Sequence, residues 1–330
     1  MKRILVTGGC GFIGRYVVEE LLKQDIWDIT VVDNLSNPES KSPTEYPFST
    51  GVRYLNLNLL DLNSCEKSIE GQEYIIHTAN KIGGVGYFHK HPQEILNDNC
   101  RINSNIIDAA CKLDIKRFVY LSSSMRYEKS ELYPHEEEHM GKIISPKTAY
   151  GQSKLIGEWM LEAAHEESGL EYSIAAPFNA YGPGEPPKVI NGKLDEGHAH
   201  VIPDLFHKVY NSKDGNVKIL GEGNQIRCYT YVEDLARGVV ELVLNKNAKN
   251  EAFNLATEEE TSVLELLDII WEISGKQENL NVIPTESFKY DVQKRVPSIE
   301  KAKKILEFNP SISLYEGLEV VKKWYDSLSE

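Results

Sequence analysis

The sequence lacks the marks of a membrane protein and of a secreted, disulfide-linked one. No apolar run approaches the length that spans a bilayer. Only five cysteines occur in 330 residues, scattered and without a CxxC pair, which is typical of a reducing compartment. No signal-peptide pattern precedes the strand pattern that begins at Arg3. We therefore expect a cytoplasmic protein.

Positive charge is also scarce, because 36 Lys and Arg stand against 50 Asp and Glu, a net charge of −14 at pH 7. Such a field repels phosphate polymers and anionic lipids, so we expect no nucleic-acid partner and no membrane partner. A ligand that carries phosphate must then be held by local groups, such as a helix N-terminus or a few arginines.

Short β-branched runs alternate with amphipathic stretches in the first half of the chain. This pattern predicts an α/β fold with a Rossmann-type, doubly wound parallel sheet. After Pro177 the sequence is turn-rich and polar to residue 200, and then alternates predicted helices with one predicted strand. We expect a Rossmann domain over residues 1–177, to which 228–255 return, and a smaller C-terminal lobe formed by 178–227 and 256–330.

A glycine-rich turn, TGGCGFIG, connects the first predicted strand to the first predicted helix. Gly8 suits a tight turn, Gly11 lets the backbone approach a pyrophosphate, and Gly14 allows the helix to pack closely on the strand. The amides at the helix N-terminus, including Phe12 and Ile13, are suited to hold phosphate. The turn therefore predicts a dinucleotide site.

Asp33 ends the second predicted strand, where a carboxylate accepts hydrogen bonds from the adenosine ribose. The same carboxylate would repel a 2′-phosphate, so we expect NAD and not NADP. Asp61, after the third strand, is a candidate for contact with the adenine. The other cofactor-binding residues expected near these strand ends are Asn34, Leu62, Thr78 and Ala79.

Tyr150 and Lys154 stand four residues apart in YGQSK, on one face of a predicted helix. An ammonium group close to a phenol lowers a tyrosine pKa that is otherwise about 10 and makes a usable base. Ser123, in the strand-end run LSSS, is placed to hydrogen-bond the same substrate oxygen. The pattern predicts that Tyr150 removes a hydroxyl proton while a hydride passes to a nicotinamide.

The order of TGGCGFIG, Asp33, HTA, SSS, YGQSK, PFNAYGPG and RCYTYVED resembles the extended short-chain dehydrogenase/reductase family of NAD-dependent nucleotide-sugar epimerases and dehydratases. Within it, NKIGGVGY and HVIPDL are most similar to GDP-fucose synthase and GDP-mannose 3,5-epimerase. The resemblance implies that Ser123, Tyr150 and Lys154 are the catalytic set. It also implies a homodimer through the predicted helices over 92–113 and 146–165.

The resemblance further implies that Asn99 is structural near the cofactor and that Pro177 and Phe178 border the nicotinamide. Asn179, Arg227 and Arg295 would hold the diphosphate of a nucleotide sugar, a task that suits arginine because its guanidinium binds phosphate through two bonds. The other residues expected at the substrate are Gly83, Gly84, Ser124, Met125 and Val201.

Two positions depart from the family pattern. Ser124 and Met125 stand where sugar 4,6-dehydratases carry an Asp-Glu pair, so elimination of water is disfavoured. Met125 also replaces the cysteine base of the two GDP-sugar enzymes, and a thioether does not accept a proton at useful pH. His200, however, matches the acid/base histidine of GDP-fucose synthase.

We therefore predict 4-epimerisation of a UDP- or GDP-hexose through a transient 4-keto sugar. The alternatives are a GDP-sugar 3,5-epimerase or a 4-keto-sugar reductase with His200 as acid/base, and a nucleotide-sensing relative without catalysis. HEEEH, from His135 to His139, matches a zinc-protease pattern. Pro134 before it and the lack of a clear third ligand favour a solvated acidic loop and no metal site.

Overall fold

The structure is a computed structural model that describes all residues except 38–50, 143–144, 191–192, 196–198, 288–291 and 329–330. Seven parallel strands form one sheet in the order β13-β6-β5-β4-β1-β2-β3. The strands are β1 (Lys2–Thr7), β2 (Trp27–Asp33), β3 (Val52–Asn56), β4 (Tyr74–His77), β5 (Arg117–Leu121), β6 (Tyr172–Pro177) and β13 (Glu251–Leu255). The predicted α/β fold with a Rossmann-type sheet is confirmed.

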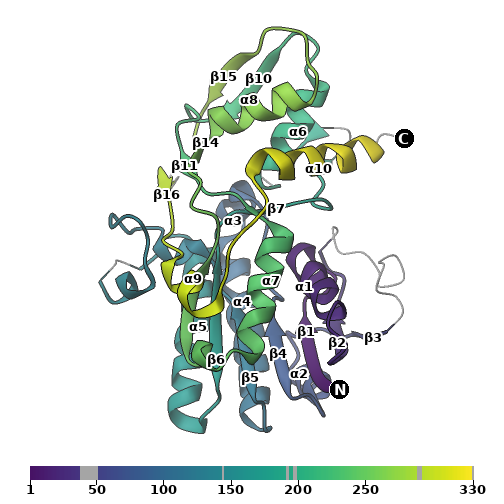
Figure 1. Ribbon diagram of the computed structural model, residues 1–330, viewed down its shortest axis with the longest axis vertical. Coiled ribbons are helices and arrows are strands. Elements are labelled where there is room, and N and C mark those ends of the chain that lie inside the picture. The colour runs from purple at the N-terminus through teal and green to yellow at the C-terminus, as the bar shows by residue number, and fades with distance from the viewer. Residues whose placement is uncertain (38–50, 143–144, 191–192, 196–198, 288–291, 329–330) are drawn as a thin grey trace.

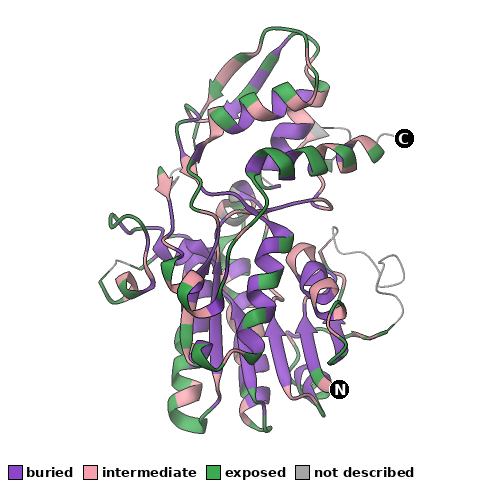
Figure 2. Ribbon diagram, viewed as in Figure 1, coloured by how far each residue is buried: buried purple, intermediate pink, exposed green. Residues whose placement is uncertain are grey.

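Helices cover both faces of this sheet (Figure 1). On one face lie α1 (Phe12–Leu22), α7 (Val232–Leu244) and α9 (Glu300–Leu306); on the other lie α2 (Leu62–Ile69), α4 (Pro92–Cys111) and α5 (Ala149–Ser168). Successive residues of β1 alternate between the two cores, with Ile4 and Val6 in one and Leu5 in the other. Because both faces are covered, the central strands β4 and β5 are buried along their whole length, whereas the edge strand β3 is partly exposed (Figure 2).

A second group of elements lies beyond the carboxyl ends of the strands (Figure 1). Its core is formed by α6 (Val201–Asn211), α8 (Val263–Ile273), α10 (Leu314–Ser327) and the parallel pair β10 (Asn216–Leu220) and β15 (Asn281–Thr285). Short strands connect it to the sheet: β7 (Ala180–Tyr181), β12 (Thr230–Tyr231), β11 (Ile226–Arg227), β14 (Thr261–Ser262) and β16 (Lys294–Arg295). The remaining elements are α3 (Val85–Lys90), η2 (Ser124–Tyr127), η3 (Glu137–Gly141), η4 (Lys246–Ala248), β8 (Val189–Ile190) and β9 (Lys193–Leu194).

None of the helices in the described part of the chain is both long enough and apolar enough to cross a bilayer.

Candidate functional site

Two cavities adjoin at the carboxyl edge of the sheet. The first, of about 560 Å³, is lined by the glycine turn and the ends of β2, β4 and β5; we call it the turn cavity. The second, of about 280 Å³, lies between the end of β5 and the second group of elements; we call it the interlobe cavity. Both are lined by Phe12, Ile13, Ile82, Gly83, Tyr150, Pro177, Glu185 and His200. The carboxyl edge of a parallel sheet is where such folds bind ligands.

The glycine turn leaves no room for a side chain at Gly8 or at Gly14. Gly8 has a φ of +67°, and a Cβ there would lie 2.7 Å from the Cα of Ala79. A Cβ on Gly14 would lie 2.1 Å from the carbonyl oxygen of Gly8. Gly11 precedes α1 without a side-chain cap, so the amides of the first turn suit a phosphate. This cradle fits the pyrophosphate of a dinucleotide.

Asp33 lies in the turn cavity, as do Asn34, Thr78 and Ala79. Its carboxylate accepts hydrogen bonds from the amides of Leu35 at 2.8 Å and Cys10 at 3.1 Å. Burial raises the pKa of Asp33, and these backbone bonds oppose the rise. The carboxylate is therefore fixed at the end of β2, where it suits a ribose and disfavours a 2′-phosphate.

Asp61 and Leu62 lie outside the lining of the turn cavity, in contrast to the expectation. The Asp61 carboxylate caps α2 and accepts hydrogen bonds from the amide and hydroxyl of Ser64, at 2.9 and 2.8 Å. Asn58 and Leu59 line the cavity instead. β3 ends at Asn56, and Asn58 and Leu59 are among the residues that follow it at this edge, so contact of Asp61 with the adenine stays a prediction.

Three other expected residues lie behind the cavity walls. Asn99 is fully buried on α4 and bonds the amide of Lys81 at 2.7 Å, which suits its expected structural role. Phe178 is fully buried against Tyr127 and lines neither cavity, although its neighbour Pro177 lines both. Gly84 caps the start of α3 and also lines neither.

Ser123, Tyr150 and Lys154 come together at the junction of the two cavities. Tyr150 is buried and hydrogen-bonds the Ser123 side chain. Nζ of Lys154 donates to the carbonyl oxygen of Leu121 at 2.6 Å and lies 5.8 Å from the centroid of the Tyr150 ring. The structure thus brings the three predicted side chains into one cluster.

Burial is the largest influence on the pKa values of this cluster. Burial raises the pKa of Tyr150 to about 12, opposed by the hydrogen bond from Ser123 and by the charge of Arg295. Burial lowers the pKa of Lys154 to about 7, opposed by Glu158. That Lys154 makes the phenol acidic stays a prediction; the structure adds Arg295 as a second cation that favours the ionised form of Tyr150.

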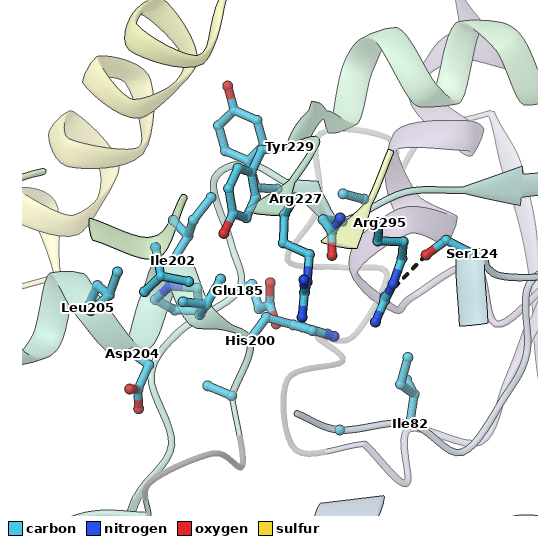
Figure 3. Close-up of a pocket in the computed structure, with 18 of the residues that line it drawn as sticks. Ile82, Ser124, Glu185, His200, Ile202, Asp204, Leu205, Arg227, Tyr229 and Arg295 are labelled. Carbon is cyan, nitrogen blue, oxygen red and sulfur yellow. Dashed lines mark hydrogen bonds and ion pairs between the residues drawn. The ribbon is translucent and has the colours of Figure 1, made fainter. Parts of the chain in front are cut away.

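The interlobe cavity collects the residues expected at the substrate: Gly83, Ser124, Met125, Asn179, Val201, Arg227 and Arg295. Figure 3 shows Arg227, His200 and Arg295 pointing toward the same space. Nη1 of Arg295 donates to Oγ of Ser124 at 3.3 Å. Arg295 therefore lies beside the reacting end of the cavity as well as near its second arginine, Arg227.

Glu185 is a site residue that the sequence reasoning missed. Its carboxylate is buried and contacts Nδ1 of His200 (Figure 3). Both side chains line both cavities. A carboxylate on Nδ1 fixes the orientation of an imidazole, so proton transfer to a ligand would involve Nε2. The signal was an acid in the loop that precedes His200.

The HEEEH segment is not the solvated loop that we expected. His135 is fully buried, stacks on Tyr127 at 4.8 Å between ring centroids, and pairs its backbone with Val296 and Ser298. Glu137 is also buried and accepts from the amide of Asn254. The segment therefore supports the strand that carries Arg295. Within the described ranges, no three His, Cys, Asp or Glu side chains gather as a metal site requires.

This glycine turn, acidic strand end and Ser-Tyr-Lys cluster define the class of short-chain dehydrogenase/reductase enzymes that use a nicotinamide dinucleotide. The chain matches the NAD dependent epimerase/dehydratase family over residues 4–256, and it belongs to that family. NAD is therefore its cofactor, as predicted, and the chain is an enzyme.

Individual relatives agree with this assignment. The chain is 32% identical over 324 residues, 97% of each protein, to a putative UDP-glucose 4-epimerase of Methanocaldococcus jannaschii. It is 30% identical over 279 residues, 81% of this chain and 77% of the relative, to a putative GDP-L-fucose synthase 2 of Oryza sativa subsp. japonica. The crystal structure of UDP-glucose 4-epimerase from Thermotoga maritima with UDP-glucose is similar with a TM-score of 0.86 at 28% identity, covering 99% of this chain and 100% of that chain.

Proposed function

We propose that the chain inverts C4 of a nucleotide-diphosphate hexose through a transient 4-keto sugar. The observation that carries this proposal is the contact between Ser123 and Tyr150 where the turn cavity and the interlobe cavity adjoin. At that junction the phenol of Tyr150 can contact a sugar in the interlobe cavity while a cofactor occupies the turn cavity. The residues of the turn cavity would hold NAD, which would supply a hydride acceptor and donor for C4. Between the two transfers the 4-keto sugar would turn in the interlobe cavity, so that its opposite face receives the hydride.

The protein's own groups move the proton. Tyr150 takes the proton of the C4 hydroxyl as the C4–H bond breaks, and it returns the proton when the ketone is reduced. Ser123 hydrogen-bonds the phenol, and Arg295 favours its ionised form. Because hydride and proton are both returned, the reaction needs no external oxidant or reductant.

The other end of the interlobe cavity suits the diphosphate. Arg227 and Arg295 point into one space in a protein of net charge −14, and Asn179 lines the same cavity. We propose UDP as the nucleotide, because two of the relatives above are named for UDP-glucose. Ser124 and Met125 supply no acid or base for elimination of water, which argues against dehydration.

The test uses the NAD-loaded protein with UDP-glucose, UDP-galactose and GDP-mannose, each followed by NMR of the sugar. We expect the two UDP-sugars to reach the same mixture from either side, without net formation of reduced cofactor. Tyr150→Phe should bind UDP-glucose and fail to convert it. Consumption of one NADPH per sugar would contradict the proposal and indicate a reductase.

A second candidate function is supported by the contact between Glu185 and His200. An oriented imidazole beside a transient ketone would exchange protons at C3 or C5, as a 3,5-epimerase of GDP-sugars or the related 4-keto-sugar reductase requires. In deuterated water, that function predicts deuterium at C3 or C5, which His200→Asn and Glu185→Gln should both slow. If the wild type incorporates none, His200 is a binding residue.

We also propose a homodimer through α4 and α5, with residues 1–177 and 228–255 as the NAD-binding domain and the remainder as the substrate lobe. The two helices pack against each other, and α5 exposes 51% of Trp159. Light scattering should give twice the chain mass for the wild type and less for Trp159→Glu. A mass of one chain for both the wild type and Trp159→Glu would contradict the dimer.

A further inference from the structure

The end of β5 contacts α5 beyond the proposed catalytic set. Leu121 accepts a hydrogen bond from Nζ of Lys154 at 2.6 Å. The next residue, Ser122, donates from its hydroxyl to the carboxylate of Glu158, one helical turn further along α5. Lys154 and Glu158 are both almost completely buried. A buried carboxylate that lies one turn from a buried ammonium requires an explanation.

Arg126, on η2, is the second partner of Glu158. Its Nη1 lies 3.2 Å from Oε2 of Glu158, and their side chains are only 5% and 3% exposed. Arg126 stands one residue after Met125, which lines the interlobe cavity, whereas Glu158 and Arg126 line neither cavity. Burying the ion pair of Arg126 and Glu158 costs solvation free energy, and neither side chain is placed to contact the sugar or the cofactor.

The other ionisable groups around this pair carry little charge near neutral pH. Burial raises the pKa of each surrounding tyrosine and lowers the pKa of His77 to about 3. The groups are His77 on β4, Tyr120 on β5, Tyr127 on η2, Tyr150 on α5 and Tyr172 on β6. On α4, which packs on α5, burial also raises the pKa of Cys100. Glu162 on α5 is a further carboxyl that repels the ionised form of Glu158.

Two opposed effects then act on Lys154. Burial lowers its pKa to about 7, while the charge of Glu158 raises it. Burial also favours the neutral form of Glu158, which Arg126 and the hydroxyl of Ser122 oppose. The protonation of Lys154 near pH 7 therefore depends on a carboxylate whose own ionisation depends on Arg126.

We propose that Glu158, kept ionised by Arg126, is a positioning residue that retains the ammonium form of Lys154 beside Tyr150. Glu158 acts through Lys154 and touches neither sugar nor cofactor. The inference rests on the proposed function, because it assigns Lys154 to the cluster that transfers the proton.

The experiment measures the titration of Lys154 directly, by NMR of the NAD-loaded protein with ¹³C-labelled lysine, and Lys154→Met identifies the signal. Glu158→Gln should lower the midpoint of Lys154 by about one pH unit or more. Turnover of UDP-glucose at pH 7 should fall about tenfold with little change in KM. Glu158→Asp should restore part of both, and Glu166→Gln, two turns further along α5, should leave both unchanged.

Glu158→Gln leaves Arg126 as a buried charge and could unfold the protein. The double variant Arg126→Met with Glu158→Gln removes both charges and should show the same lowered midpoint. A midpoint within about 0.3 units of wild type in either folded variant would overturn the proposal, even if turnover falls. If Glu158→Gln lowers the midpoint of Lys154 but the wild-type protein converts no sugar, the role of Glu158 is supported and the proposed function is contradicted.

Discussion

Lys154 donates its ammonium hydrogen bond to the carbonyl oxygen of Leu121, at 2.6 Å, and so is held by the end of β5. Its Nζ also lies 5.8 Å from the centroid of the Tyr150 ring, whose pKa burial raises to about 12 against the opposing effects of Ser123 and Arg295. Arg295, a cation that favours the ionised form of Tyr150, comes from the C-terminal part of the chain, on β16.

Replacing Arg295 should shift the pH profile of turnover. Because Arg295 favours the phenolate, Arg295→Met raises the pKa of Tyr150, and the acid limb of kcat moves to higher pH by about one unit. Arg227→Met is the matched control, since Arg227 lines the same cavity and does not act on Tyr150. Arg227→Met should raise KM and leave the acid limb of kcat unshifted. If both variants have the same pH profile of kcat, Arg295 only binds phosphate.

Asp33 should determine the choice of cofactor. Asp33→Ser removes a carboxylate that suits ribose hydroxyls, and we expect NAD affinity to fall about ten- to a hundredfold. NADP affinity should rise, because the charge that repels a 2′-phosphate is gone. Calorimetry with both nucleotides checks this. An unchanged NAD affinity would place the adenosine ribose elsewhere.

Gly14 should tolerate no side chain. In Gly14→Ala the Cβ would meet the carbonyl oxygen of Gly8 at 2.1 Å, so the turn must shift. We expect a loss of about 1–3 kcal/mol in the free energy of unfolding, with loss of NAD binding. Gly141→Ala, where a Cβ meets nothing within 4 Å, is the control and should stay within about 0.5 kcal/mol of wild type. Similar urea midpoints for the two variants would contradict the close packing.

His77 should make the fold sensitive to acid. Its pKa is lowered to about 3 by burial, from an unfolded value of 6.5, so the unfolded state binds more protons between these values. Stability is therefore fully present above pH 6.5 and is lost as the pH falls toward 3, by on the order of a few kcal/mol. Urea unfolding of His77→Gln between pH 7 and 4 should show a flatter dependence than wild type. Parallel curves would mean that other groups carry the effect.

Periodicity predicted the elements well where a core face is continuous. The helix expected over 92–113 is α4, which begins at Pro92 and ends at Cys111, because its apolar residues pack on the sheet. The helix expected from Pro146 begins instead at Ala149, because the hydroxyl of Thr148 caps it. The short helix α3 was not predicted, because glycines in and before it conceal a helical pattern.

The site residues could be predicted where a motif of fixed residue types and spacing has a single known role. The glycine turn, Asp33 and the Ser-Tyr-Lys set follow from motif and order. The capping role of Asp61 was not predicted, because the sequence does not show that α2 begins directly after it. Glu185 was missed because its contact with His200 joins two ends of a loop without periodicity. Burial, which sets the pKa of Tyr150, is not visible in a motif.

The most direct measurement of the central claim uses UDP-glucose with deuterium at C4 and the NAD-loaded protein in ordinary water. The account predicts UDP-galactose that keeps the deuterium at C4, because the hydride leaves and returns within one site while only the hydroxyl proton passes through Tyr150. Loss of the C4 deuterium to water, or its appearance in external nucleotide, would contradict a 4-epimerase that returns its own hydride.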